Sequence, residues 1–188
     1  MSEETPLDTA EIARIAKRLD RPIVLVGLMG VGKSTVGRKL AELLGCGFVD
    51  ADEEIEKAAQ RSISEIFKEF GESYFRDGER RVITRLIGET GGVIATGGGA
   101  FVDDETRAVI LDNAIAVWIH SDIDILVERT SRRDTRPLLQ NGDPKEILTN
   151  LYEAREPYYS QAQVKVTSAN TPHAETAWSI LKAIDKWL

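Results

Sequence analysis

Eight consecutive residues near the start of the chain have the types and spacing of a phosphate-binding loop. Gly27–Ser34 reads Gly-Leu-Met-Gly-Val-Gly-Lys-Ser and fits the pattern G-x-x-x-x-G-K-[ST]. The glycines permit a tight turn that aims backbone N–H groups at one anion, and the helix that follows adds the positive end of its dipole. In such a loop Lys33 reaches the β- and γ-phosphates, and the Ser34 hydroxyl ligates Mg²⁺. The residues that we expect to bind these phosphates are Gly30, Val31, Gly32, Lys33, Ser34 and Thr35.

Two further polar segments follow predicted strands. Asp50-Ala51-Asp52 comes after the strand predicted at Gly47–Val49, and Gly97–Gly99 comes after the one at Val93–Ala95. Ligands of an open parallel sheet bind beyond the carboxyl ends of its strands, so chain order places both segments beside the phosphate loop. The nucleotide site therefore gains carboxylates and a flexible backbone segment at the same edge of the sheet.

The two aspartates have a structural and a functional interpretation. Acidic residues at this position often cap the helix that follows a strand. Beside a phosphate loop, Asp50 is instead placed to hold the water shell of Mg²⁺. Asp52 is placed to accept hydrogen bonds from substrate hydroxyls or a proton from the attacking one. The triple glycine favours close approach of backbone to a ligand over a plain tight turn, because each glycine loses much backbone entropy on folding.

Arginine is the last residue type with a chemical use here. Arg129, Arg132, Arg133 and Arg136 fall within eight positions, which is typical of a solvated charged surface. Phosphoryl transfer, however, needs cations at the transferred group, and a closing loop is one way to deliver them. Spacing alone gives Arg76, Arg155 and the two histidines no more than structural or surface roles. The two histidines are His120 and His173.

The elements that must position these residues alternate along the chain. Short apolar strands are predicted at Ile23–Val26, Gly47–Val49, Val93–Ala95, Ala116–Ile119 and Val164–Val166. Helices are predicted between and after them, at Ser62–Phe70, Glu72–Leu86, Glu105–Leu111, Ile123–Thr130 and Pro172–Leu188. This alternation predicts an α/β protein whose parallel sheet is covered by helices on both faces.

Two segments differ from this pattern. Residues 1–21 contain an amphipathic helix, since Ile12, Ile15, Ala16 and Leu19 recur at helical spacing, and we expect it to pack on the flank of a single domain at 22–188. Ser131–Pro144 is rich in Arg, Asp, Asn, Gly and Pro, which favours a surface loop.

Composition narrows the class of protein. The 188 residues suffice for one α/β domain, and 24 basic against 31 acidic residues give a net charge of −7, which disfavours nucleic acid as a partner. The single cysteine rules out an intrachain disulfide. No apolar run approaches the length of a membrane span, and the first residues do not resemble a signal peptide. We expect a cytoplasmic protein.

Several motifs together resemble the shikimate kinase family from about Pro22 to the C-terminus. The matching segments are the phosphate loop with Thr35, Asp50-Ala51-Asp52, Phe75-Arg76 followed by Glu79, Gly97-Gly98-Gly99-Ala100, Arg136-Pro137-Leu138-Leu139, and Arg155-Glu156-Pro157-Tyr158-Tyr159. The resemblance implies a three-layer α/β/α fold with a five-stranded parallel sheet of order 2-3-1-4-5. It also implies a substrate-binding region at about 51–80 and a lid at about 131–144.

The resemblance also implies a reaction and a role for each residue. The reaction is transfer of the γ-phosphoryl group of MgATP to the 3-hydroxyl of shikimate, with Lys33, Asp52 and Arg136 as catalytic residues. Independently of the resemblance, we expect a monomer. Arg76 and Arg155 bind the shikimate carboxylate, which matches the forked geometry of guanidinium. Gly97–Gly99 offers backbone contacts, Arg129 stacks on adenine, and Asn170 is a candidate adenine contact.

Two alternatives remain at this point. One is a kinase for another small hydroxy acid such as gluconate, against which the paired arginines and the triple glycine argue. The other is a non-kinase nucleotide-binding protein, such as a GTPase-type switch or regulatory module. A GTPase-type switch needs D-x-x-G and N-K-x-D segments, and the sequence contains neither.

Overall fold

The computed structural model describes residues 5–132 and 141–188, and its centre is a five-stranded parallel sheet. The strands are β1 (Ile23–Val26), β2 (Phe48–Asp50), β3 (Val93–Ala95), β4 (Ile115–His120) and β5 (Val164–Thr167). Their order is β2-β3-β1-β4-β5, and every neighbouring pair is parallel. The predicted strand order is confirmed, and the five strands lie within one residue of their predicted ends.

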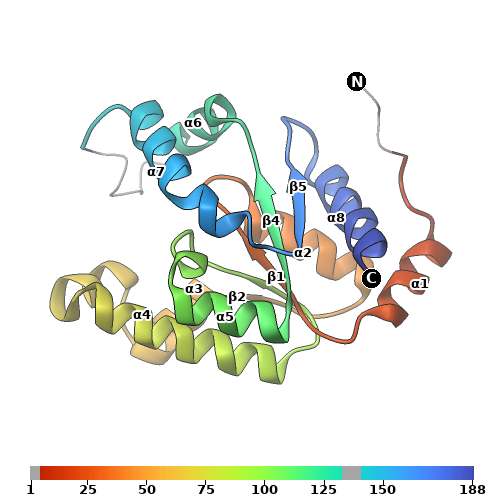
Figure 1. Ribbon diagram of the computed structural model, residues 1–188, viewed down its shortest axis with the longest axis horizontal. Coiled ribbons are helices and arrows are strands. Elements are labelled where there is room, and N and C mark those ends of the chain that lie inside the picture. The colour runs from red at the N-terminus through yellow and green to blue at the C-terminus, as the bar shows by residue number, and fades with distance from the viewer. Residues whose placement is uncertain (1–4, 133–140) are drawn as a thin grey trace.

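Helices cover both faces of the sheet, as Figure 1 shows. On one face α2 (Lys33–Leu44) packs against α8 (His173–Trp187), and α1 (Thr9–Arg18) contacts both. On the other face α5 (Asp104–Asn113) packs between β4 and α4 (Ile63–Glu89). The central strands are buried except at His120, which ends β4, so their sequences are almost continuous apolar runs, whereas β5 alternates buried and exposed residues as an edge strand does.

The remaining helices lie around the carboxyl ends of the strands. The short α3 (Ala51–Ala59) follows β2 and packs on α4, while α6 (Ile123–Ser131) follows β4 and packs on α7 (Pro144–Tyr159). Hydrophobic periodicity predicted neither α3 nor α7. The helix α4 bends at Gly71, whose φ of 84° and ψ of 175° are non-helical, so the two helices predicted at Ser62–Phe70 and Glu72–Leu86 are its two halves.

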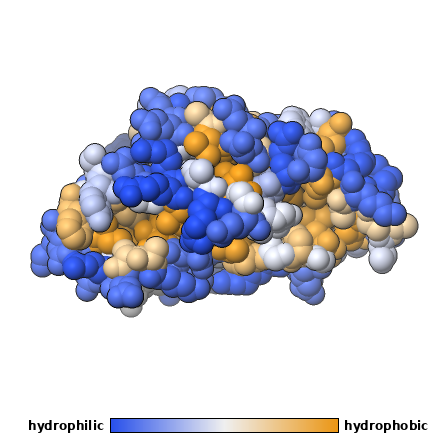
Figure 2. Space-filling view, turned by 90° about the horizontal axis from the view of Figure 1, so that it is seen from below, coloured by the Kyte–Doolittle hydropathy of each residue, from blue (hydrophilic) through white to orange (hydrophobic). Residues whose placement is uncertain are grey.

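The surface is mixed in polarity. Figure 2, the view from below, shows hydrophobic patches separated by hydrophilic residues rather than one continuous hydrophobic face. Large exposed hydrophobic residues among those described are Phe67, Phe70, Tyr74, Trp187 and Leu188. In the part of the chain that the structure covers, every helix is too short or too polar to span a bilayer.

The helix α1 is tied into the domain by one buried side chain and one ion-pair group. Ile15 is 1% exposed and belongs to the main hydrophobic core. Arg14 donates two hydrogen bonds to the Asp185 carboxylate of α8, of 2.9 and 2.7 Å, and Arg18 pairs with the same group. Because these ion pairs are solvent-exposed, we attribute most of the anchoring to burial of Ile15.

Ile15→Ala should therefore lower the free energy of unfolding by about 2–4 kcal/mol, because it removes buried methyl groups and leaves a cavity. Since α1 does not line the cavity described below, turnover below the melting temperature should stay unchanged. Urea unfolding and a steady-state assay measure the two effects. If Arg14→Ala lowered the free energy of unfolding by a similar amount, burial of Ile15 would not be the main contribution to the anchoring of α1.

Candidate active site

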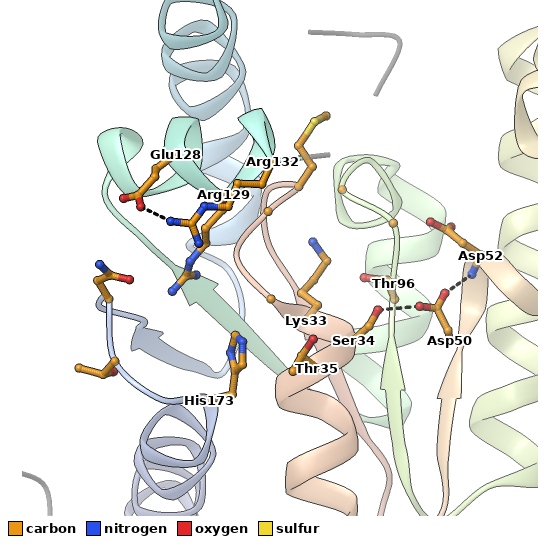
Figure 3. Close-up of a pocket in the computed structure, with 17 residues that line it drawn as sticks. Lys33, Ser34, Thr35, Asp50, Asp52, Thr96, Glu128, Arg129, Arg132 and His173 are labelled. Atoms are coloured by element: carbon orange, nitrogen blue, oxygen red, sulfur yellow. Dashed lines mark hydrogen bonds and ion pairs between the residues drawn. The ribbon is translucent and has the colours of Figure 1, made fainter. Parts of the chain in front are cut away.

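A cavity of about 570 Å³ opens at the carboxyl ends of the strands. Figure 3 shows its side chains converging from the phosphate loop, the starts of α3 and α8, and the end of α6. Every predicted phosphate ligand except Val31 lines it, together with Asp50, Asp52, Gly97, Gly98, Arg129 and Asn170. The lining residues that sequence analysis did not assign to the site are Met29, Thr96, Glu128, Arg132, Thr171 and His173.

The phosphate loop adopts the tight turn that its glycines predict. Gly27, Gly30 and Gly32 have φ values of 144°, 84° and 94°, which side-chain-bearing residues rarely adopt. Space is restricted as well, because a Cβ on Gly30 would lie 2.9 Å from the Cγ2 of Thr130. The backbone therefore reaches α2 in the conformation that directs N–H groups towards an anion.

Lys33 lies beneath the loop, largely buried at 9% exposure. Its ammonium donates hydrogen bonds of 2.6 and 2.9 Å to the carbonyl oxygens of Gly27 and Leu28. These carbonyls hold a positive charge at the loop itself, where phosphate oxygens are expected to bind. Lys33 is therefore placed to exchange backbone partners for phosphate oxygens.

Both interpretations of Asp50 hold in the structure. One carboxylate oxygen caps α3 by accepting from the backbone N–H groups of Asp52 and Glu53, at 3.0 and 3.4 Å. The other accepts a 2.7 Å hydrogen bond from the Ser34 hydroxyl. A hydroxyl and a carboxylate side by side are the oxygen donors that Mg²⁺ uses in phosphate sites, where it keeps most of its waters and needs few protein ligands. These two residues fit a Mg²⁺ site.

Asp52 is the carboxylate that faces the cavity beside Asp50 (Figure 3). Burial is the main cause that raises its pKa, to about 6, and the negative charge of Asp50 acts in the same direction. Lys33 and Arg76 lower the pKa by a smaller amount. Asp52 thus remains ionised at neutral pH but is a stronger base than an ordinary aspartate.

The three glycines after β3 each face one predicted substrate-binding side chain. A Cβ on Gly97 would lie 2.9 Å from the Oδ1 of Asp52, and one on Gly98 would lie 2.9 Å from the Nη1 of Arg155. A Cβ on Gly99 would collide with the guanidinium of Arg76, with its Cζ at 2.9 Å. Residues from α3, α7 and α4 therefore meet at this loop only because it has no side chains.

Gly99→Ala tests this packing. Its backbone φ of −94° suits alanine, so the added methyl group acts by displacing Arg76 rather than by straining the backbone. We expect the KM for the acceptor substrate to rise about tenfold or more, with little change in the KM for the nucleotide. Gly88→Ala is the matched control, because a Cβ at Gly88 in α4 would meet nothing within 4 Å. Equal effects of the two changes would contradict the contact with Arg76.

Arg76 is held in place by a buried carboxylate. It donates a 2.7 Å hydrogen bond to Glu79, which is only 1% exposed, and pairs more loosely with Glu72 at 3.6 Å. Burial raises the pKa of Glu79 to about 7, against the opposing effect of the Arg76 charge. A small apolar cluster of Ile55, Ile66 and Phe75 packs α3 against α4 next to this pair. The Arg76 guanidinium is thus oriented by Glu79 and Glu72, which lie on either side of Arg76 along α4.

Arg155 reaches the same loop from the second half of α7. The helix begins with Asp143 as N-cap and Pro144 in its first turn. One turn after Arg155, the fully buried Tyr159 donates its hydroxyl hydrogen bond to the carbonyl oxygen of Gly98. This bond fixes α7 against the glycine loop and so sets the position of Arg155.

At the end of the cavity away from the glycine loop, Arg129 connects the phosphate loop to the turn before α8. Arg129 donates hydrogen bonds to the carbonyl oxygens of Val31, at 3.2 Å, and Ala169, at 2.9 Å. Asn170 lines the cavity beside it, and Arg132 pairs with Glu128 at 2.6 Å. Arg133 and Arg136 of the predicted lid lie outside the described residues.

His173 has a place that sequence analysis did not predict, since we expected it to be structural or exposed. It is the first residue of α8 and lines the cavity. No spacing signal could have revealed this, because the contact depends on α8 packing against α2. His120, by contrast, ends β4 and is not among the residues that line the cavity.

The family model and two relatives of high sequence identity all identify the shikimate kinase family. The family model described as shikimate kinase matches residues 29–185. The shikimate kinase of Novosphingobium aromaticivorans is 61% identical over 187 residues, covering 97% of this chain and 96% of the relative. That of Caulobacter vibrioides is 58% identical over 164 residues, covering 87% of this chain and 82% of the relative.

Solved structures give the same fold. Shikimate kinase from Acinetobacter baumannii, in complex with shikimate, aligns with a TM-score of 0.83 and 38% identity over 91% of this chain and 97% of that one. A gluconokinase from Sinorhizobium meliloti aligns with a TM-score of 0.57 and 20% identity over 89% of this chain and 93% of that one. The second similarity is one of fold alone.

Proposed function

The chain belongs to the shikimate kinase family, and from this we propose that its cavity transfers the γ-phosphoryl group of MgATP to the 3-hydroxyl of shikimate. The observation that carries the proposal is the meeting of Asp52, Arg76 and Arg155 at the glycine loop, next to a phosphate-binding loop. Two guanidinium groups suit a planar carboxylate, and a carboxylate base suits a hydroxyl.

The proposed mechanism is an in-line displacement with a loose transition state, so positioning and neutralisation of charge dominate. Lys33 and the N-terminus of α2 neutralise the β- and γ-phosphates. Ser34, with Asp50 through water, would hold Mg²⁺, which neutralises phosphate charge when bound. Arg136 remains a proposed catalytic residue because of the family motif that contains it.

On the acceptor side, Arg76 and Arg155 would bind the shikimate carboxylate, and Asp52 would orient the 3-hydroxyl. As the phosphorus–oxygen bond forms, the hydroxyl proton passes to Asp52, whose raised pKa makes it a better base than an ordinary aspartate. Gly97–Gly99 would contact the substrate through its backbone. At the donor end, Arg129 would stack on adenine and Asn170 would contact it.

We also propose that the enzyme works as a cytoplasmic monomer, with ATP and shikimate as its ligands. The net charge of −7 supports the expectation that nucleic acid is not a partner. The position of the new bond tests the reaction itself. Phosphorus and proton NMR of the product should place a phosphate monoester on carbon 3 of shikimate; a product phosphorylated elsewhere would contradict the proposed placement of Asp52.

Arg76→Lys and Arg155→Lys test the carboxylate assignment. Lysine keeps the charge but loses the fork, so we expect each change to raise the shikimate KM about ten- to a hundredfold with the ATP KM nearly constant. Arg80→Lys is the matched control, because Arg80 lies one turn further along α4 and pairs with Asp77 and Glu105 instead. Unchanged shikimate KM values in both variants would show that the arginines bind something else.

A further inference from the structure

His173 lies between the phosphate loop and the proposed adenine end of the cavity. Its ring packs on Gly32, the N-cap residue of α2: a Cβ at Gly32 would lie 3.3 Å from Cε1 and 3.5 Å from Nδ1. Asn170 and Thr171, just before it in the chain, line the proposed adenine end. Figure 3 shows the ring of His173 beside Thr35, in the first turn of α2. It therefore adjoins the middle of a nucleotide whose terminal phosphates sit on the loop.

The two ring nitrogens have different surroundings. Nδ1 is buried and has no hydrogen-bond partner among the described residues. The nitrogen available to a molecule in the cavity is therefore Nε2. Because a buried N–H without an acceptor is especially unfavourable, and the positive end of α8 favours a lone pair next to it, the proton belongs on Nε2.

Charge around the ring favours this neutral form. Burial lowers the pKa of His173, and the positive charge of Arg129 from α6 lowers it further. Both α2 and α8 begin beside the ring, so the positive ends of two helices also face it. At neutral pH the side chain is thus a hydrogen-bond donor through Nε2, directed at a ligand rich in acceptor oxygens.

We propose that His173 is a nucleotide-binding residue that donates a hydrogen bond from Nε2 to the α-phosphate or ribose oxygens of ATP. The proposal rests on the proposed function only in taking the bound nucleotide to be ATP. Its chemistry predicts that His173 contributes to affinity for any nucleotide with this phosphate–sugar unit. It predicts no contribution to choice of base or to binding of the acceptor.

Calorimetric titration with ADP in the absence of shikimate tests the proposal directly. His173→Ala should weaken ADP binding about three- to a hundredfold, the range from a hydrogen bond to a neutral ribose oxygen up to one to an anionic phosphate, and should weaken GDP binding by the same factor. His173→Gln, which retains a donor near the position of Nε2, should restore most of the ADP affinity. His120→Asn, a change at the only other histidine, is the control and should leave ADP affinity unchanged.

Kinetics separate this role from a structural one. His173→Ala should raise the KM for ATP but not the KM for shikimate, whereas loosening of α8 would affect both. Unchanged ADP affinity, no rescue by glutamine, or a changed ratio of ADP to GDP affinity would each overturn the proposal. Because the titration contains no acceptor, these outcomes are independent of whether shikimate is the substrate.

Discussion

Lys33→Met is expected to lower kcat by about a hundred- to a thousandfold, the usual effect of removing one preorganised charge from a transition state. Methionine keeps most of the apolar stem, so the packing beneath the phosphate loop is largely retained. The lost group is the ammonium that Gly27 and Leu28 now hold at the loop. The KM for ATP should rise as well, since the same charge meets the phosphates in the ground state.

Steady-state kinetics with a melting curve of the same preparation give the required measurement. Lys39→Met is the matched control, because Lys39 lies on the same helix and its ammonium pairs only with Glu42, at 3.2 Å, among the contacts described. Its turnover should stay near that of the parent protein. If Lys33→Met retained normal kcat, the loop would bind phosphate without contributing to the chemistry.

Asp52→Asn is expected to lower kcat by about a hundred- to ten-thousandfold, because asparagine can orient a hydroxyl but cannot accept its proton. In the parent protein, kcat/KM should decline as the pH falls below about 6, where Asp52 becomes protonated. Glu53→Gln, at the exposed neighbouring position, is the control. A normal rate in Asp52→Asn would mean that Asp52 positions the acceptor without acting as the base.

The same substitution should increase stability, and the sign follows from the direction of the pKa shift. Burial raises the pKa of Asp52 to about 6 in the folded protein, so the folded state binds more protons than the unfolded state between about pH 4 and 6. Stability is therefore lost as the pH rises through this range. Asp52→Asn should recover about 1–3 kcal/mol at pH 8 and little at pH 4 in urea unfolding.

Much of the fold could be predicted from local patterns, and the confirmed family resemblance gave its strand order. The central strands β1 and β3 were located to the residue because burial on both faces makes each a continuous apolar run. The two missed helices lack such a signal. Only Ala51 and Ile55 of α3 are buried, and α7 buries Leu148 and Tyr159 while containing an internal proline. Their stability depends on caps and tertiary contacts that periodicity does not report.

Only some residues of the candidate site could be predicted from local sequence patterns. The motif of the phosphate loop specifies which of its residues contact phosphate and Mg²⁺, so these residues could be named without a structure. The side-chain neighbours of Gly97–Gly99 could not, since the structure places Asp52, Arg155 and Arg76 against these glycines, while the backbone contact with a ligand that we expected there stays a prediction. Those three residues come from separate helices, and local spacing cannot place them together. His173 was missed for the same reason.

The central claim is that ATP turnover at this site requires shikimate as acceptor. A coupled assay of ADP formation with shikimate, with gluconate and with no acceptor tests it most directly. We predict ADP formation at least about a hundredfold faster with shikimate than in either other reaction, because gluconate cannot place its carboxylate on Arg76 and Arg155 and a hydroxyl at Asp52 in the same geometry, and water makes neither contact. Equal rates in all three reactions would contradict the account and indicate a nucleotide hydrolase, and a preference for gluconate would identify a different kinase.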